Sequence, residues 1–228
     1  MDFNIAFELN FISIVIKEMN ESEHIRRNRK KWDRWSEVAD GQGPVFDHLR
    51  RSQSKLISIL DLKEGISLLD MGCGTGWAVG QIARTLGFSG KFYGADLSEK
   101  MLARARENHQ GLSNIYFIQS NSENVLLESD MFDIIICTNS FHHYLHPERA
   151  VKEFHRLLKK GGKLYILDPA ADMFIIKVVD MLIKLIEPEH VKIYSSAEFR
   201  GMFIASGMKY LDSVPTGRGE KVQIAEKI

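Results

Sequence analysis

The order of apolar and polar positions from residue 66 onward alternates between two patterns. Short apolar runs, typical of buried strands, lie at 66–71, 91–96, 114–119, 132–139 and 163–168. Segments with apolar residues three and four positions apart, typical of amphipathic helices, lie at 76–87, 98–109 and 147–162. Strands that alternate with helices predict right-handed crossovers and a mostly parallel sheet, which is an α/β fold.

The end of the chain predicts a different connection. A helix at about 196–206 precedes two strands, near 209–214 and 222–228, that are joined by the segment PTGRGE. This segment is too short for a crossover helix, so the last strand should pair antiparallel. In such sheets, ligands bind beyond the carboxyl ends of the parallel strands, and the segments that follow those ends should line one crevice. These segments are 70–77, 96–97, 120–123 and 139–146.

The first 60 residues have a helical pattern, so we divide the chain into an N-terminal extension or lid, 1–60, and a main domain, 61–228. Residues 1–16 are apolar, and a basic run from Arg26 to Lys31 follows them. Three uses of this segment stay open: peripheral contact with an anionic membrane, cover for a sheet edge, or a homodimer contact. Residues 171–194 predict a second apolar helix, which either contributes to a binding site or docks on residues 1–16.

Composition narrows the class of protein. The chain has 228 residues, with 30 basic residues balancing 30 acidic ones, so bulk charge does not favour a nucleic-acid partner. Cys73 and Cys137 are the two cysteines, too few for a disulfide framework or a zinc knuckle. No apolar run reaches the length of a membrane span, and the N-terminus lacks the features of a signal peptide. These features predict a cytoplasmic protein.

The segment LLDMGCGTGW, residues 68–77, carries glycines at every second position between a predicted strand and helix. Backbone N–H groups at such a helix start suit an anionic group at short range. The dinucleotide pattern G-x-G-x-x-G would need a third glycine at position 77 or 79, which hold Trp77 and Val79. A phosphate-binding G-K-[ST] is also absent.

The pattern apolar-apolar-Asp-x-Gly-x-Gly-x-Gly instead resembles motif I of the class I S-adenosylmethionine-dependent methyltransferases. Three later segments extend the resemblance: DLSEKML at 96–102, QSNSENV at 119–125, and the block FDIIICTN to YILDP at 132–169. The last is similar to members that methylate small molecules, including the quinone-biosynthesis branch. The resemblance covers about residues 30–170 well and the rest by topology only.

This resemblance implies a Rossmann-like three-layer sandwich with a seven-stranded sheet, and S-adenosyl-L-methionine as cofactor. It implies that Asp70 accepts from the cofactor's ammonium group and that Asp96 accepts from its ribose hydroxyls. Trp32 or Trp35 would shield the methionine end. The implied cofactor-binding residues are Asp70, Gly72, Gly74, Gly76, Asp96, Leu97, Met101, Asn121, Ser122 and Asn139.

Other interpretations of these residues stay open. Asp70 and Asp96 also suit capping positions at the start of the following turn or helix. Asn121 stands where the family usually has Asp; its side-chain oxygen still accepts a hydrogen bond, but Asn is also a common turn residue. Trp32 and Trp35 are three positions apart, so they also suit one packed helix face.

Methyl transfer from a sulfonium is a direct displacement, and it needs a base only when the acceptor holds a proton. The candidates are His142, His143 and His146, of which His142 or His143 is favoured as the base, with Tyr144 and Asp168 as weaker ones. The His-His-x-x-His spacing at 142–146 also suggests a metal site, but no carboxylate or cysteine stands at a matching spacing, so no metal site is predicted. Packing of the histidines near the cofactor is the plainer alternative. We therefore expect a methyltransferase for a small or lipid-like acceptor. The alternatives are an inactive binding protein with this fold and, more distantly, a nicotinamide-dependent oxidoreductase.

Overall fold

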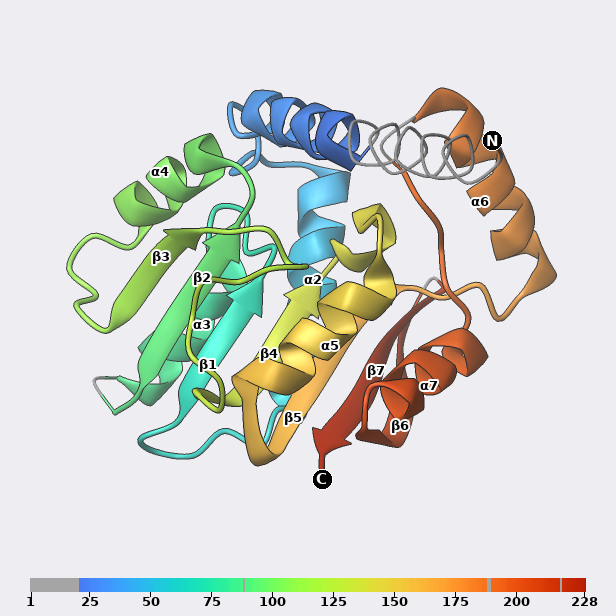
Figure 1. The fold of residues 1–228 in the computed structure, drawn as a ribbon. Helices are drawn as coiled ribbons and strands as arrows, with labels where there is room; N and C mark the ends of the chain where they lie inside the picture. Colours follow the sequence, from blue (N-terminus) through green and yellow to red (C-terminus); the bar gives the residue numbers. More distant parts are fainter. Residues whose placement is uncertain (1–20, 88, 188–189, 218) are drawn as a thin grey trace, which may run out of the picture.

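The computed structural model describes residues 21–228, apart from 88, 188–189 and 218, and its centre is one seven-stranded sheet (Figure 1). The strand order is β3-β2-β1-β4-β5-β7-β6. β7 is antiparallel to both β5 and β6, whereas the pairs among β1 to β5 are all parallel. The predicted mostly parallel sheet with an antiparallel last strand is confirmed. The strands are β1 (Ser67–Met71), β2 (Lys91–Asp96), β3 (Ile115–Gln119), β4 (Phe132–Thr138), β5 (Leu158–Pro169), β6 (Met208–Gly217) and β7 (Glu220–Lys227).

The helices between these strands follow the predicted segments, with one boundary error. The predicted helix 147–162 ends at Leu157, because Leu158 is extended and pairs with Phe132. Gly161, near the end of that predicted segment, lies within β5 at a positive φ of 76°. The described elements are a helix at 21–35, α2 (Pro44–Ile59), α3 (Trp77–Leu86), α4 (Glu99–Asn108), η1 (Phe141–His143), α5 (Pro147–Leu157), α6 (Phe174–Ile186) and α7 (Ser196–Ala205).

Two apolar clusters lie on opposite faces of the sheet and make the three layers. One contains Leu69 and Ile135 from the strands, together with Phe154 of α5 and Phe199 of α7. The other contains residues of β1, β2 and β4, packed against α2 and α3. Leu56 of α2 is fully buried in this second cluster, so α2 covers the sheet although it precedes the predicted boundary at residue 61. The division at 60/61 itself stays a prediction.

The helix at residues 21–35 lies across the carboxyl edge of the parallel strands (Figure 1). Asn28 Nδ2 donates to the backbone oxygen of His143 at 3.3 Å, and Lys31 forms a 2.6 Å ion pair with Glu187. These contacts tie the helix to the segments after β4 and after α6. The predictions for residues 1–16 lie outside the described residues.

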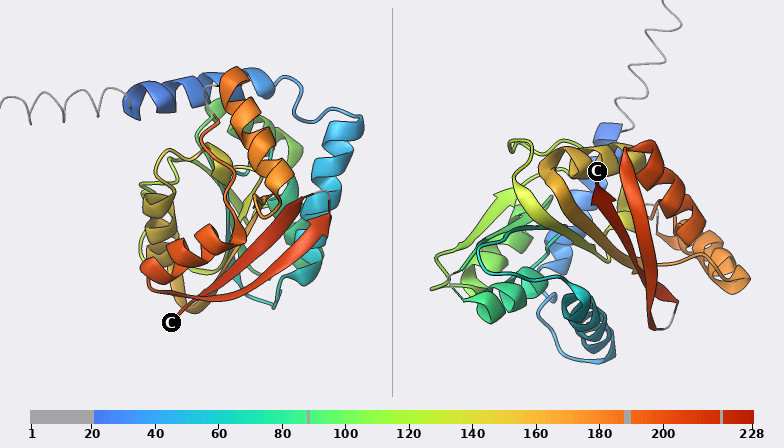
Figure 2. Two further views of the ribbon diagram at one scale, coloured as in Figure 1. Left: turned by 90° about the vertical axis from the view of Figure 1, so that its right-hand side faces the viewer. Right: turned by 90° about the horizontal axis from the view of Figure 1, so that it is seen from below.

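The helix predicted at 171–194 is shorter, because α6 covers Phe174–Ile186 and the described residues between 187 and 194 are not helical. α6 stands at the rim of the domain (Figure 2), with Phe174 80% and Leu185 77% exposed. Among the helices that the structure describes, none has both the length and the apolar character needed to cross a bilayer.

Candidate active site

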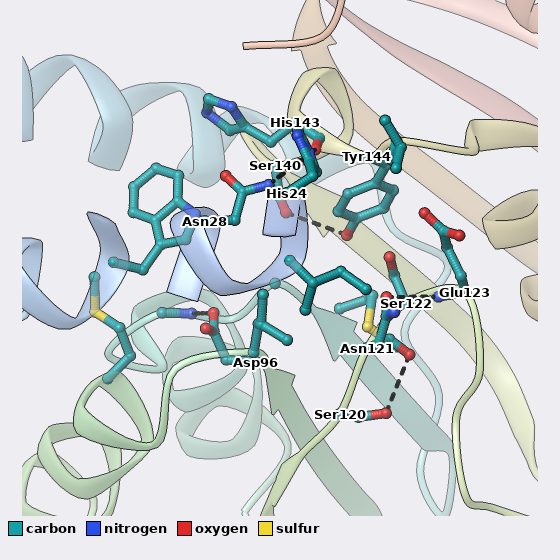
Figure 3. A pocket seen from close by; sticks show the side chains of 18 of the residues that line it. His24, Asn28, Asp96, Ser120, Asn121, Ser122, Glu123, Ser140, His143 and Tyr144 are labelled. Atoms are coloured by element: carbon teal, nitrogen blue, oxygen red, sulfur yellow. Dashed lines mark hydrogen bonds between the residues drawn. The ribbon is translucent and has the colours of Figure 1, made fainter. Parts of the chain in front are cut away.

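Two adjoining cavities lie at the carboxyl edge of the sheet, where the strand order reverses between β1 and β4. The smaller has a volume of about 150 Å³ and lies between β2, the β3 end and the helix at residues 21–35 (Figure 3). The larger, about 400 Å³, continues between that helix, α2 and the glycine loop. Gly72, Gly74 and Asn139 belong to both walls, so the cavities meet at the loop after β1 and the end of β4.

The three loop glycines have positive φ angles of 74°, 54° and 79°, but they are needed for different reasons. A Cβ on Gly72 would collide with the hydroxyl of Ser140, and one on Gly76 would lie 3.0 Å from the rings of His109 and Phe117. A Cβ on Gly74 would meet no atom within 4 Å, and this glycine lines both cavities. Of the three, only Gly74 leaves open space in front of its backbone. Gly76 lies outside the lining of both cavities.

Asp70 is a buried carboxylate without a hydrogen-bond partner among the described residues, for either oxygen. Burial raises its pKa from 3.8 to about 7; the nearby Val79 N–H partly offsets this increase, and the charge of Asp96 adds to it. A buried carboxylate with no partner carries a large desolvation cost. It therefore suits a ligand that brings a positive charge. Asp70 lines neither cavity, so its contact with a ligand stays a prediction. The Val79 N–H in the first turn of α3 also keeps the capping alternative open.

Asp96 ends β2 and holds the glycine loop in place. Its two oxygens accept from the backbone N–H groups of Gly74 and Ser98, each at 2.9 Å. Burial raises the pKa of this carboxyl in spite of these bonds. Ser98 is the cap of α4, since its hydroxyl accepts from the Met101 N–H. Asp96, Leu97 and Met101, which the family resemblance implies as cofactor-binding residues, all line the smaller cavity, and their contacts with the cofactor stay a prediction.

Polar side chains from the ends of β3 and β4 complete the smaller cavity (Figure 3). Asn121 and Ser122 line it, but the Asn121 side-chain oxygen also accepts from the Glu123 N–H at 3.1 Å. The turn interpretation of Asn121 therefore applies, and its contact with adenine stays a prediction. Asn139 has a positive φ of 51°, and its buried Nδ2 has no partner in the described part of the chain.

The histidines after β4 have distinct surroundings. His142 Nδ1 lies 2.9 Å from the Asp168 carboxylate, which also accepts from the His142 backbone N–H. Burial alone would lower the pKa of His142, but the charge of Asp168 outweighs it and raises the pKa. His143 packs edge-to-face on Trp32, with ring centroids 5.1 Å apart. Both histidines line the larger cavity, and their predicted role as a base stays a prediction.

The larger cavity has an aromatic wall that sequence reasoning identified only in part. Trp32 and Trp35 line it as expected, and Trp32 also lines the smaller cavity. Phe46 and Gln53 of α2 were not predicted; the Gln53 amide donates to Thr138 at 2.9 Å. The amphipathic pattern of α2 was the available signal for these residues, but it does not tell which side chains reach a cavity.

Comparisons with known proteins agree with this fold. A family profile described as "Methyltransferase domain" matches residues 62–202. The uncharacterized methyltransferase YcgJ of Bacillus subtilis is 32% identical over 152 residues, 64% of this chain and 58% of its own. The ubiquinone/menaquinone biosynthesis C-methyltransferase UbiE of Escherichia fergusonii is 30% identical over 110 residues, 47% of this chain and 44% of its own. This chain thus spans about half the length of the curated relatives it matches.

Among solved structures, a SAM-dependent methyltransferase from Aquifex aeolicus superposes with a TM-score of 0.63 at 25% identity, covering 77% of this chain and 89% of its own. A putative methyltransferase from Bacillus halodurans gives a TM-score of 0.65 at 25% identity, covering 71% of this chain and 70% of its own. The profile match spans more than half of the chain. The glycine loop and Asp96 lie at the carboxyl ends of β1 and β2, where sheets of this type bind ligands. The chain therefore belongs to the methyltransferase domain family, in the class I group that depends on S-adenosylmethionine.

Proposed function

We propose that this chain transfers a methyl group from S-adenosylmethionine to a small, largely apolar acceptor held in the larger cavity. The observation that carries the proposal is the open space in front of Gly74, which lines both cavities. Asp70, four residues earlier at the end of β1, adds a buried carboxylate without a geometric hydrogen-bond partner among the described residues. A ligand that carries a cationic group and approaches the loop backbone closely would pair with the Asp70 carboxylate and fill the space in front of Gly74. The methionine end of the cofactor has this chemistry, since it carries an ammonium and a carboxylate.

The residues of the smaller cavity fit the remaining parts of the cofactor. Asp96 keeps lone pairs that can accept from the two ribose hydroxyls while it holds the Gly74 and Ser98 amides. Leu97 and Met101 offer apolar surface for the flat adenine ring. The unpaired Nδ2 of Asn139 is a donor for the cofactor's carboxylate.

Bound S-adenosylmethionine supplies an electrophilic methyl group on a sulfonium. The protein must hold the acceptor in line with that methyl and keep water away. Trp32, which lines both cavities, is placed to separate the two ligands from solvent. Positioning of this kind lowers reaction barriers by roughly 7–11 kcal/mol.

The wall of the larger cavity supports an apolar acceptor. Trp35, Val45, Phe46 and Leu49 form its apolar part, and aromatic surface of this kind favours rings or chains. Its polar part includes the charged residues Lys31, Asp40, Arg50 and Glu187. The similarity to UbiE, a quinone C-methyltransferase by its name, supports the same class. A quinol or another apolar phenol is therefore the first acceptor to test.

The test is calorimetric titration with S-adenosylmethionine, S-adenosylhomocysteine and NADH, followed by release of S-adenosylhomocysteine with pooled apolar phenols. We expect the first two ligands to bind with dissociation constants on the order of micromolar, no binding of NADH, and turnover with one pool. Preferential binding of NADH would refute the cofactor. Tight cofactor binding without turnover on any pool would instead favour a binding protein.

A further inference from the structure

Three imidazoles that are far apart in the sequence meet beside the larger cavity. His142 and His143 belong to η1 after β4, and His190 comes from the segment between α6 and α7. Their ring centroids are 4.0 Å, 5.5 Å and 6.1 Å apart. One ring nitrogen from each lies within 4.8 Å of the other two. A shift of about 1 Å would bring the three to the separation that a tetrahedral ion with metal–nitrogen bonds of about 2 Å requires.

Two buried carboxylates orient this cluster from behind. Asp168 accepts from the backbone N–H of His142 and contacts its Nδ1, which directs Nε2 of that ring to the other side. Asp180 lies 2.7 Å from Nε2 of His190, and its position is fixed by the Ile193 N–H at 2.7 Å. Metal-binding histidines characteristically pair their second nitrogen with a carboxylate, which sets the tautomer and the ring orientation.

The surroundings favour a cation at this point. His143 and His190 are 7% and 6% exposed, so the cluster is shielded from solvent. Asp168 and Asp180 stand behind the rings, and Lys184 pairs with Asp180 at 2.9 Å. One negative charge of the two carboxylates therefore remains to favour a divalent cation. A set of imidazole ligands suits zinc, copper, iron or nickel rather than magnesium or calcium.

We propose that His142, His143 and His190 bind one divalent transition-metal ion, with Asp168 and Asp180 as the carboxylates that orient the ligands. His142 and His143 line the larger cavity, so the fourth coordination position faces the space assigned to the acceptor. Sites with three protein ligands and one open position are typical of catalytic rather than structural ions. In the ion-bound protein the two histidines are ligands and do not themselves take a proton from the acceptor.

A bound ion would also restrict which acceptors can react. This restriction rests on the proposed methyl transfer, whereas the binding of the ion is independent of that proposal. An acceptor with a hydroxyl or thiol would bind the ion through that atom and lose its proton to solvent more readily. The resulting anion then forms the new bond to the methyl carbon as the carbon–sulfur bond of the cofactor breaks and the sulfonium becomes a neutral thioether. Apolar phenols and thiols should therefore be methylated in preference to amines.

The test is metal binding by the untagged full chain. The protein is stripped with a chelator, dialysed against Zn²⁺ or Co²⁺, and assayed by elemental analysis and by the visible spectrum of bound Co²⁺. We expect one ion per chain and a spectrum of tetrahedral, nitrogen-rich Co²⁺. His190→Ala should weaken Zn²⁺ binding by at least about 100-fold, and Asp168→Asn by roughly 10- to 100-fold, the usual effect of an outer carboxylate.

His155→Ala is the matched control, since this histidine lies near Gly207, away from the cluster, and should leave zinc affinity unchanged. Wild-type protein that retains no ion would overturn the proposal, as would zinc affinity that survives both His142→Ala and His190→Ala. S-adenosylmethionine titration of His190→Ala separates the two proposals, because His190 lines neither cavity and cofactor affinity should be retained. If a His190 variant does not fold, the wild-type Co²⁺ spectrum decides alone: a spectrum of octahedral, oxygen-ligated Co²⁺ would refute the site.

Discussion

Replacing Asp70 with Asn should make the ligand-free protein more stable and the cofactor complex weaker. The pKa of Asp70 rises from 3.8 to about 7 on folding, through burial first and the charge of Asp96 second. A carboxyl whose pKa is higher in the folded than in the unfolded protein favours the folded state most at a pH below its unfolded-state pKa, where it is protonated in both states. It loses that contribution as pH rises through the folded pKa. An increase of about 3 in pKa corresponds to about 4 kcal/mol, so Asp70 costs up to about 4 kcal/mol at pH 8.

Asp70→Asn removes this charge while keeping the shape of the side chain. We expect the free energy of unfolding to rise by up to about 4 kcal/mol at pH 8 and by up to about 2 kcal/mol at pH 5, where the folded carboxyl is already protonated. The loss of an acceptor for the cofactor's ammonium should weaken S-adenosylmethionine binding by about 1.5–3 kcal/mol, or roughly 10- to 150-fold.

The assays are urea unfolding at the two pH values and calorimetric titration at pH 8. Asp212→Asn, at an exposed position of β6, is the control for an Asp-to-Asn change without burial. Equal stability of the Asp70→Asn variant and the wild type at pH 8 would refute the burial argument. Higher stability with unchanged cofactor affinity would show that the carboxylate does not meet the ammonium.

Three further substitutions test the cavities. Asp96→Ala should weaken S-adenosylmethionine binding by about 1.5–3 kcal/mol in calorimetry, and unchanged affinity would rule out the ribose contact. Gly74→Val should abolish cofactor binding while circular dichroism shows a retained fold, because the added side chain would enter the open space; Gly111→Ala, also at positive φ beside open space, is the matched control. Trp32→Ala should lower kcat/KM for the acceptor by at least tenfold, through loss of roughly 1.5–3 kcal/mol of apolar contact, and an unaltered kcat/KM would exclude Trp32 from the acceptor wall.

The positions of the main strands and of the Asp70–Gly76 loop followed from sequence because they depend on local signals. Apolar runs predict the strands, and the cofactor motif is contiguous. The end of α5 did not follow, because Leu158 is recruited into β5 by pairing with Phe132, a contact that periodicity within one segment does not contain. The helix pattern and the strand pattern overlap there, and tertiary pairing decided between them.

The histidine cluster is a second feature that depends on tertiary contacts and that local sequence patterns therefore do not predict. Near His142 and His143 the sequence offers His146 as the third imidazole, whereas in the structure the third is His190. His190 follows α6 and reaches the cluster only through the tertiary fold. Similarly, the need for glycine at 76 comes from His109 at the end of α4, not from a ligand. Contacts between residues far apart in the chain cannot be predicted from the local pattern of a single sequence.

If the proposed methyl transfer holds, the helix at residues 21–35 also bears on how often one acceptor molecule is methylated before it leaves. Trp32 is part of the wall of both cavities, and no residue of this helix belongs to either core cluster among the residues that the structure describes. Polar contacts such as Asn28–His143 and Lys31–Glu187 hold it in place. Any outward displacement would therefore uncover both ligands together. Exchange of spent cofactor would release the acceptor as well, so that repeated methylation would be distributive, with one methyl group added per encounter.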